Sequence, residues 1–295
     1  MTKVKRGQVI CSLKDLLFPV ELRDNPMPCN QEYSKLVIGQ INGGDFFLNA
    51  CSPRYELVPN NAIFPTIEEI LRDKKRKIEF DVQYSHTHNI RFYANYIITD
   101  KRYSYKMDGT NDEICPVLRV QHSYNGLTKY RIMFGYFRVI CSNGLTVPVQ
   151  EMDKYNLVII GKHTKSILGS LKQLDTLLNM FVNEAVQITK SITEKYEMLA
   201  VRKIVNVKKR VEQVLTQNKI GMIDNQNFNT VENIAKRILN ESKDERLGYN
   251  KKVNDWLVYN GINQYLNDDN VNIAAPEKRI EVDSKILEYM LKNAA

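Results

Sequence analysis

Apolar and polar residues alternate along much of the first half of the chain. The alternating runs form three pairs, each joined by a short turn-forming segment: 35–41 with 46–52, 78–85 with 91–98, and 116–123 with 128–134. Asn125-Gly126 lies between the runs of the third pair, and both residue types accept the positive φ that tight hairpin turns require. The pattern predicts antiparallel strands that are joined as hairpins.

A short helix is predicted between the first and second pairs. Thr66 is followed three residues later by Glu69, which is the spacing of a capping box at a helix N-terminus. The predicted helix covers residues 66–76, and basic residues crowd its end: Lys74, Lys75, Arg76 and Lys77. Because cations suit the negative pole of a helix C-terminus, this cluster has a structural explanation of its own.

The period of the apolar pattern changes beyond residue 165. From Leu171 to Leu199 apolar residues recur three or four positions apart, and neither glycine nor proline interrupts the run. A single helix over 171–199 would be about 44 Å long. Its narrow apolar stripe fits either a helix lying across the sheet or a coiled-coil seam. Further helices are predicted at 207–217, 231–241, 250–266 and 284–292, with connectors at 224–229 and 273–280.

These elements predict an α+β fold. We expect an antiparallel, hairpin-rich curved sheet, followed by a long helix and a helical C-terminal region. We predict two parts of the chain, a β-rich domain at 1–165 and a helical region at 166–295, and we expect the long helix to pack on the sheet.

Composition indicates an ordinary globular protein, with 43% hydrophobic and 26% charged residues. The sequence has no run of eighteen apolar residues, so no membrane helix is expected. Residues 1–18 do not read as a signal peptide, and the cytoplasm of a bacterial cell is therefore the expected location. Five cysteines are widely spaced without a Cys-x-x-Cys pair, so most of them are expected to be small buried side chains.

The formal net charge of +8 is concentrated in two zones. Residues 71–140 contain thirteen Lys or Arg against seven Asp or Glu, and residues 190–219 contain eight against three. Two basic zones favour an acidic partner, with nucleic acid first and acidic protein second. The alternative is that these side chains only keep exposed faces hydrated.

Basic and aromatic residues are interleaved in the first zone. Single-stranded nucleic acid is typically held this way, with cations on phosphates and rings stacked on bases. The predicted nucleic-acid contacts are Arg91, Tyr93, Tyr96, Lys101, Arg102, Tyr103, Tyr105, Lys106 and Arg131. Because alternate residues of a strand face opposite sides, some aromatics, such as Phe80, Phe92 and Tyr96, could instead point into a core.

Few residues suggest catalysis or metal binding. The chain lacks phosphate-loop, dinucleotide-binding, hydrolase-elbow, zinc-protease and EF-hand signatures. His86 and His88 could bind a metal with Cys115, His122 or His163, but no spacing fixes a third ligand. Asp108, Asp112 and Glu113 are expected to be solvated. Arg138, Cys141 and Asn143 are expected to serve the fold, with Asn143-Gly144 forming a turn. We therefore predict no enzyme activity, no metal and no cofactor.

Five short segments, in order, carry a family resemblance. They are Arg-Tyr-Glu-Leu-Val-Pro-Asn at 54–60, His-Ser-Tyr-Asn-Gly at 122–126, Arg-Val-Ile-Cys-Ser-Asn-Gly-Leu at 138–145, Gly-Lys-His-Thr at 161–164, and the aromatic run 256–266. Over residues 33–270 the sequence resembles the phage- and plasmid-associated proteins grouped as domain of unknown function 932. The resemblance implies a mobile-element setting, often near replication and repair genes, and implies no particular activity.

Two functions of different classes are consistent with the sequence. The first is non-catalytic binding and annealing of single-stranded DNA in replication or recombination, by a homo-oligomer without membrane contact. The order of a hairpin-rich basic sheet and a long helix is similar to that of single-strand annealing proteins. The alternative is a structural or protein-interaction role, as a virion component or an oligomeric scaffold.

Overall fold

The computed structural model describes residues 8–27, 33–72, 78–126, 129–138, 143–145, 158–161, 167–218, 228–266 and 276–293. Its main element is an eight-stranded antiparallel sheet, in which β1, β5, β6, β8, β9 and β10 are neighbours in that order. β7 pairs with β8, and β11 pairs with β9. The strands are β1 (Gln8–Cys11), β5 (Phe80–Thr87), β6 (Arg91–Ile98), β7 (Tyr105–Lys106), β8 (Glu113–Ser123), β9 (Tyr130–Arg138), β10 (Asn143–Leu145) and β11 (Val158–Gly161).

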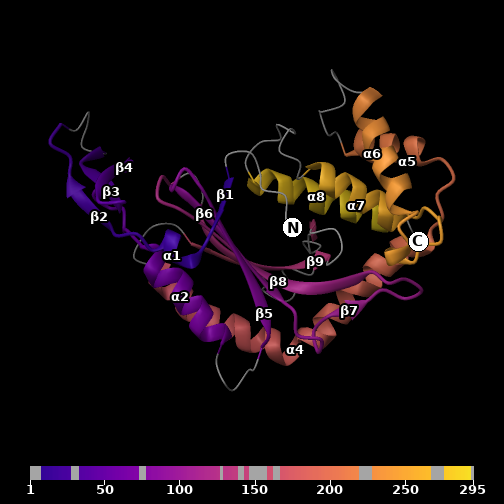
Figure 1. Ribbon diagram of the computed structural model, residues 1–295, viewed down its shortest axis with the longest axis horizontal. Helices are drawn as coiled ribbons and strands as arrows, with labels where there is room; N and C mark the ends of the chain where they lie inside the picture. The colour runs from indigo at the N-terminus through magenta and orange to yellow at the C-terminus, as the bar shows by residue number, and fades with distance from the viewer. Residues whose placement is uncertain are drawn as a thin grey trace.

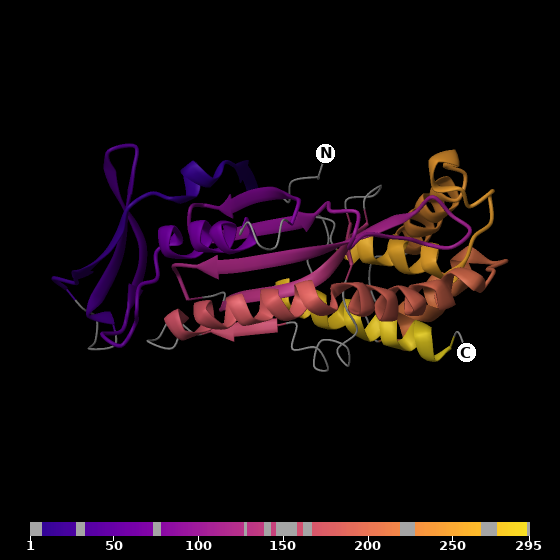
Figure 2. The same ribbon diagram turned by 90° about the horizontal axis from the view of Figure 1, so that it is seen from below.

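A second, three-stranded antiparallel sheet forms an arm at one end of the molecule (Figures 1 and 2). It contains β2 (Val20–Asp24), β3 (Lys35–Ile41) and β4 (Gly44–Cys51). Asn42 and Gly43 connect β3 to β4 with φ angles of 53° and 78°. Two consecutive left-handed residues match the twist of a tight hairpin, so the Asn-Gly pair makes this turn. The sequence predicted the hairpin but not its separation from the main sheet.

Helices make up most of the second half of the chain. They are α4 (Ile167–Val201), α5 (Val207–Gln217), α6 (Phe228–Glu241), the short 3₁₀ helix η2 (Glu245–Leu247), α7 (Asp255–Leu266) and α8 (Pro276–Lys292). The first half adds α1 (Leu13–Leu16) and α2 (Asn60–Leu71). Figure 1 shows α2 and α4 on one side of the main sheet and α7 and α8 on its other side, toward the end opposite the arm. The α+β class predicted from the sequence is confirmed.

The face of the main sheet toward α2 and α4, called the inner face here, is apolar. Pairing places Tyr96, Leu118 and Phe134 opposite one another on three neighbouring strands, and all three are buried. On the same face, Tyr84 contacts Phe64 of α2 ring to edge, and the Tyr136 hydroxyl lies 3.1 Å from the Thr189 hydroxyl of α4. Burial of this face against two helices is the main source of stability for the sheet.

The second half of the apolar stripe on α4 lies in the core. Ile188, Ile192, Tyr196 and Leu199 are buried, and the Tyr196 ring lies 4.9 Å from that of Trp256 on α7. The side chains of the first half, Leu171, Leu174, Leu178, Phe181 and Ala185, lie outside the described residues. The described part of the stripe therefore packs against other elements of the same chain, as expected for a helix that lies across the sheet.

Several elements differ from the prediction. The helix expected at 66–76 is α2, which already begins at Asn60. Thr66 therefore lies inside the helix, where its hydroxyl donates to the Ala62 carbonyl, and it does not cap the N-terminus. α8 begins at Pro276, in a segment predicted as a connector, because proline suits the first turn of a helix. Asn143 and Gly144 lie in strand β10, not in a turn.

A buried polar network connects the sheet to the helical region. Asp112, expected to be solvated, has a fully buried side chain that forms an ion pair with Arg138 at 2.5 Å. The same carboxylate accepts hydrogen bonds from the Tyr249 hydroxyl (2.8 Å) and from Trp256 Nε1 (2.9 Å). Arg138 also pairs with Glu241 of α6. The prediction for Asp112 is wrong because the groups that bury it include Tyr249 and Trp256, which lie more than a hundred positions away in the sequence.

Candidate nucleic-acid interface

The face of the main sheet opposite the inner face carries polar side chains, and we call it the outer face. Pairing places Tyr93, Gln121 and Arg131 side by side on β6, β8 and β9. The next row places Asn95 beside Arg119. All members of the set are partly exposed: Gln83, Ser85, Arg91, Tyr93, Asn95, Arg119, Gln121 and Arg131. Four neighbouring strands therefore carry arginines, amides and one aromatic ring on a single face, and the part of this face around Arg119 lies close to Asp283 of α8.

Strand alternation produces this surface from the sequence. On β6, Phe92, Ala94 and Tyr96 are buried, so the residues between them point to the other side. On β8, Val120 and His122 are buried, and Arg119 and Gln121 alternate with them. Because paired residues share a face, the polar positions of the four strands are brought into register.

The electrostatics of the outer face are dominated by arginine. Arg91, Arg119 and Arg131 lie there, with Asp81 as the acidic residue of the same face on β5. Burial lowers the pKa of the Arg119 guanidinium, and the nearby Asp283 carboxylate acts in the opposite direction. Arg119 Nη2 donates to the Tyr136 carbonyl at 3.3 Å. An arginine side chain stays protonated in proteins, so Arg91, Arg119 and Arg131 each carry a positive charge, which Asp81 and Asp283 offset in part.

Gln121 lies at the centre of the row formed with Tyr93 and Arg131. Its Oε1 atom is buried and accepts no hydrogen bond from any described residue. A buried acceptor without a donor is costly unless a ligand or water supplies one. Gln121 can therefore accept a hydrogen bond from a group that binds on the outer face.

The predicted contacts at 101–106 lie at the opposite end of the main sheet from Arg91. Lys101 follows the end of β6, whose eight residues span roughly 23 Å from Arg91. Lys101 Nζ pairs with Glu113 at 2.5 Å, and Arg102 Nε contacts the Asp100 carboxylate at 2.9 Å. In the same stretch, the Tyr105 hydroxyl donates to Glu197 of α4, and Lys106 is exposed. Three of the predicted contacts thus already have carboxylate partners.

Two aromatic predictions are corrected. Tyr96 is 0% exposed on the inner face, where its ring contacts Phe80 and Tyr84. Tyr103 is 6% exposed, and the Arg102 guanidinium lies over its ring, 5.2 Å from the centroid. Neither ring offers a free face on which a base could stack, because both are part of the packed interior.

Residues considered for metal or nucleophilic chemistry do not converge where they are described. The His122 ring is buried, lying 6.0 Å from the Phe92 ring and 5.1 Å from the Tyr124 ring. Burial raises the pKa of the Cys115 thiol to about 12. Across the described residues, no three His, Cys, Asp or Glu side chains lie close enough to hold a metal ion. Cys29, Cys141, His163 and the basic cluster at 74–77 lie outside the described residues.

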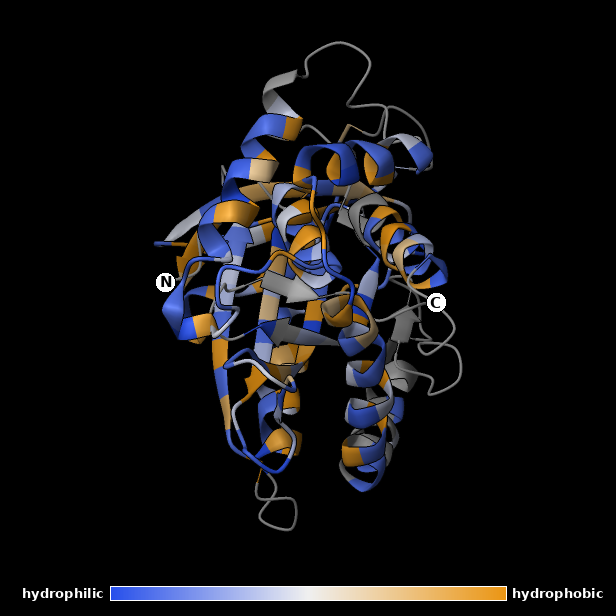
Figure 3. Cartoon of the chain, turned by 90° about the vertical axis from the view of Figure 1, so that its right-hand side faces the viewer, coloured by the Kyte–Doolittle hydropathy of each residue, from blue (hydrophilic) through white to orange (hydrophobic). Residues whose placement is uncertain are grey.

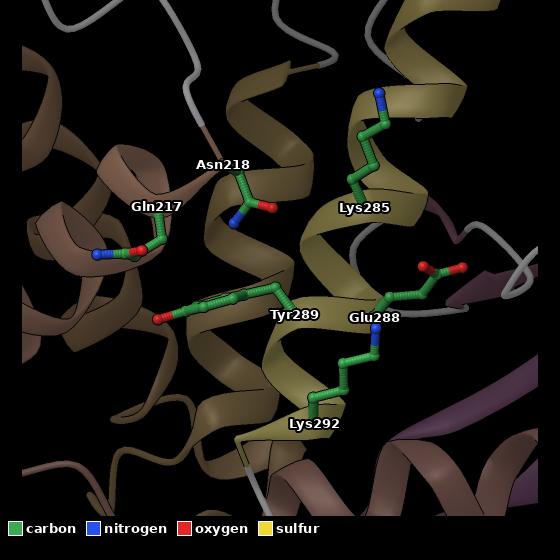
Figure 4. Close-up of a pocket in the computed structure, with 6 residues that line it drawn as sticks. All are labelled: Gln217, Asn218, Lys285, Glu288, Tyr289 and Lys292. Atoms are coloured by element: carbon green, nitrogen blue, oxygen red, sulfur yellow. The ribbon is translucent and has the colours of Figure 1, made fainter.

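A pocket of about 310 Å³ lies between the end of α5 and α8 (Figure 4). Its lining is Gln217, Asn218, Lys285, Glu288, Tyr289 and Lys292. The Asn218 amide donates to the Val214 carbonyl, and Lys285 pairs with Glu281 at 2.7 Å. The lining contains no nucleophile beside a base, so it offers no arrangement for covalent catalysis.

Sequence reasoning missed Arg119, Gln121 and Asn95 as members of the site. The alternation of Arg119 and Gln121 with buried apolar residues was visible in the sequence. What the sequence alone did not provide was the pairing register that places them between Tyr93 and Arg131.

Comparison with known proteins gives a family and no close relative. The family model described as "Domain of unknown function (DUF932)" matches residues 47–286. Neither the curated proteins nor the solved structures contain a match to this chain. Among the helices of the described residues, none combines the length and apolar composition needed to span a membrane.

Proposed function

Since the chain belongs to the family described as domain of unknown function 932, we propose its function from its own surface: it binds single-stranded nucleic acid on the outer face. DNA is the favoured strand, and the proposed consequence is strand annealing in replication or recombination of a phage or other mobile element. The activity needs no catalytic group, metal or cofactor, because binding and pairing of strands require only positioning and charge.

The observation that carries this proposal is the row of Tyr93, Gln121 and Arg131, flanked by Arg91 and Arg119. Guanidinium groups bind phosphates, an amide side chain can bond to base edges, and a tyrosine ring can stack on a base. Tyr93 and Arg131 are two strand spacings apart, or about 10 Å. That span corresponds to roughly three phosphates of a stacked strand.

A charge-reversal experiment tests the location of the site. We would measure fluorescence anisotropy of a labelled 40-nucleotide strand with the full-length chain at several salt concentrations. Arg91→Glu with Arg131→Glu should weaken binding strongly and lower the log–log salt slope by about 1.4, since each phosphate contact contributes about 0.7. Circular dichroism of each variant checks that the fold is retained.

The matched control is Lys101→Glu with Arg102→Glu, which changes the net charge by the same amount. Because these residues pair with Glu113 and Asp100, their reversal should have a much smaller effect. Equal weakening by both double variants would mean that charge acts diffusely and that the outer face is not the site. A wild-type chain that does not bind the strand at low salt would refute the proposed function.

Annealing is tested separately from binding. Complementary labelled oligonucleotides are mixed with the protein in the absence of metal and ATP, and duplex formation is followed by energy transfer. The wild-type chain should accelerate pairing, and the Arg91→Glu, Arg131→Glu variant should not. Binding without acceleration would limit the function to strand protection.

The alternative role, self-assembly into a structural scaffold, is favoured by one observation. Phe46 and Phe47 of β4 are 49% and 63% exposed on the arm, and β4 lies at the edge of its three-stranded sheet. Exposed aromatics on an edge strand can pair with a second copy. Light scattering of the wild type and of Phe46→Ser with Phe47→Ser separates the two roles: loss of an oligomer without loss of strand binding assigns the arm to assembly only.

A further inference from the structure

Five exposed lysines gather at the end of the molecule opposite the arm. They are Lys203, Lys209, Lys243, Lys251 and Lys252, and we call them the lysine patch. The ion pairs formed among the described residues at this end involve other side chains. The patch therefore carries positive charge that the neighbouring carboxylates do not neutralise.

Backbone pairing brings the members of the patch together from separate segments. Lys203, which follows α4, forms a bridge with Asn254, which precedes α7. The Lys251 amide donates to the Ser242 carbonyl at 3.0 Å, which holds the Lys251–Lys252 loop beside the end of α6. Figure 3 looks onto this end of the molecule, where helix ends and loops present many hydrophilic residues.

Lys209 joins the same end through α5. Its backbone amide donates to the Asn206 side chain at the start of the helix, at 3.0 Å. The next residue, Arg210, pairs with Asp255 of α7 through two contacts of 2.8 Å. This bidentate pair fixes α5 against α7, and so fixes Lys209 near the segment that precedes α7.

The arginines of this end are already engaged. Arg210 is buried in its pair with Asp255, and Arg202 contacts the same carboxylate at 3.5 Å and the Asn293 carbonyl. Lys208 pairs with Glu232 at 2.7 Å. Arg246 pairs with Asp244 at 2.5 Å. Among the described residues of this end, the basic groups without an ion-pair partner are therefore mainly ammonium groups on flexible stems. The nearby Tyr249 ring is 5% exposed.

We propose that the lysine patch binds the phosphate backbone of double-stranded nucleic acid. Ammonium groups act as point charges on phosphates and do not read bases, so the contact would be independent of sequence. The inference rests on the proposed function: the outer face holds a single strand, and the patch holds the duplex that pairing produces. Protein–protein interfaces are depleted in lysine, which makes an acidic protein the less suitable partner.

Two exposed valines at this end would favour a different partner for the lysine patch, namely a protein. Val201 and Val205 are 81% and 100% exposed, at the end of α4 and just before α5. An apolar side chain gains nothing from a phosphate backbone but does contribute to a protein interface. Replacing both valines with serine should therefore leave duplex binding unchanged.

The test uses the full-length chain and a labelled 30-base-pair duplex of arbitrary sequence, with anisotropy measured across salt concentrations. Lys203→Ala, Lys251→Ala and Lys252→Ala combined should weaken duplex binding at least about tenfold near 0.1 M salt. The log–log slope should fall by up to about 2.7, because each lost phosphate contact removes about 0.9. The matched control removes three exposed lysines on other elements, Lys14, Lys190 and Lys285, and should change the affinity less than about twofold.

The outcomes separate this inference from the proposed function. Loss of duplex binding in the patch variant, with single-strand binding retained, supports both. A chain that binds the single strand but not the duplex, or a patch variant that matches its control, overturns the inference alone. Binding of a polyglutamate peptide in place of duplex, with loss on Val201→Ser and Val205→Ser, reassigns the patch to an acidic protein. Circular dichroism confirms that each variant is folded.

Discussion

Replacing Asp112 with alanine should be among the most destabilising single changes in this protein. The side chain is 0% exposed, as is that of Arg138, so solvent does not screen the ion pair between them. Breaking a buried ion pair by removing one partner costs about 3–5 kcal/mol. The Tyr249 hydroxyl and Trp256 Nε1 would also lose their acceptor, at about 1–3 kcal/mol each if no water replaces it.

Glu241 should reduce the loss of stability that Asp112→Ala causes. It contacts the Arg138 guanidinium from α6 and remains in the variant, so part of the positive charge stays compensated. Because these contributions are not additive, we expect a net loss of about 3–5 kcal/mol, a large fraction of the roughly 5–15 kcal/mol that stabilises a typical domain.

Urea unfolding measures this loss. The chain contains one tryptophan, Trp256, which lies within the network, and its fluorescence and the far-ultraviolet circular dichroism should report the same transition. Asp108→Ala is the matched control, because that aspartate is exposed four residues earlier and its loss should cost less than about 0.5 kcal/mol. A loss below about 1 kcal/mol for Asp112→Ala would refute the reasoning. Pairing Asp112→Leu with Arg138→Met should recover part of the stability, because the Arg138 guanidinium is no longer buried without Asp112. The recovery is incomplete because Glu241, whose side chain is 10% exposed, loses its contact with Arg138.

Two further predictions concern the core. Ile188→Ala should cost about 2–5 kcal/mol in urea unfolding, because this side chain is 1% exposed; Val186→Ala on the same helix, at an exposed position, should cost little. A small cost at Ile188 with loss of an oligomer would instead identify a coiled-coil seam. Cys115, whose pKa burial raises to about 12, should be alkylated very slowly at pH 8 in the folded protein. Mass spectrometry after timed iodoacetamide treatment should show fast labelling only in urea, and equal rates in both conditions would contradict the burial.

The sequence pattern predicted correctly those helices and strands that are determined by neighbouring residues in the sequence. The alternation at 91–98 gave β6 with its bounds, and the helix predicted at 207–217 is α5 without change. The start of α7 was predicted five residues too early, because Asn250 and Lys251 adopt left-handed φ angles of 50° and 62° that no helix contains. Backbone conformation at such positions depends on distant contacts, here the bond from the Lys251 amide to Ser242.

The candidate site was only partly predictable for the same reason. Alternation implied that Tyr93 and Tyr96 face opposite sides, but not which side is buried. Because α2 and α4 pack on the side that Tyr96 faces, Tyr96 is the buried one of the two. The ion pairs of Lys101 and Arg102 likewise depend on folded geometry, although Asp100 is a near neighbour in sequence.

The network around Asp112 has a consequence for how the protein is made. Asp112 and Arg138 leave the ribosome before Tyr249 and Trp256, which follow Arg138 by 111 and 118 residues. At synthesis rates of about 5–20 residues per second, the charged pair waits roughly 6–24 s for the groups that enclose it. During the first part of that interval, until Val201 is synthesised, the sheet also lacks the complete α4, which covers its inner face. The nascent β-rich half therefore exposes apolar surface for seconds, and its folding is completed only when the helical half has been synthesised.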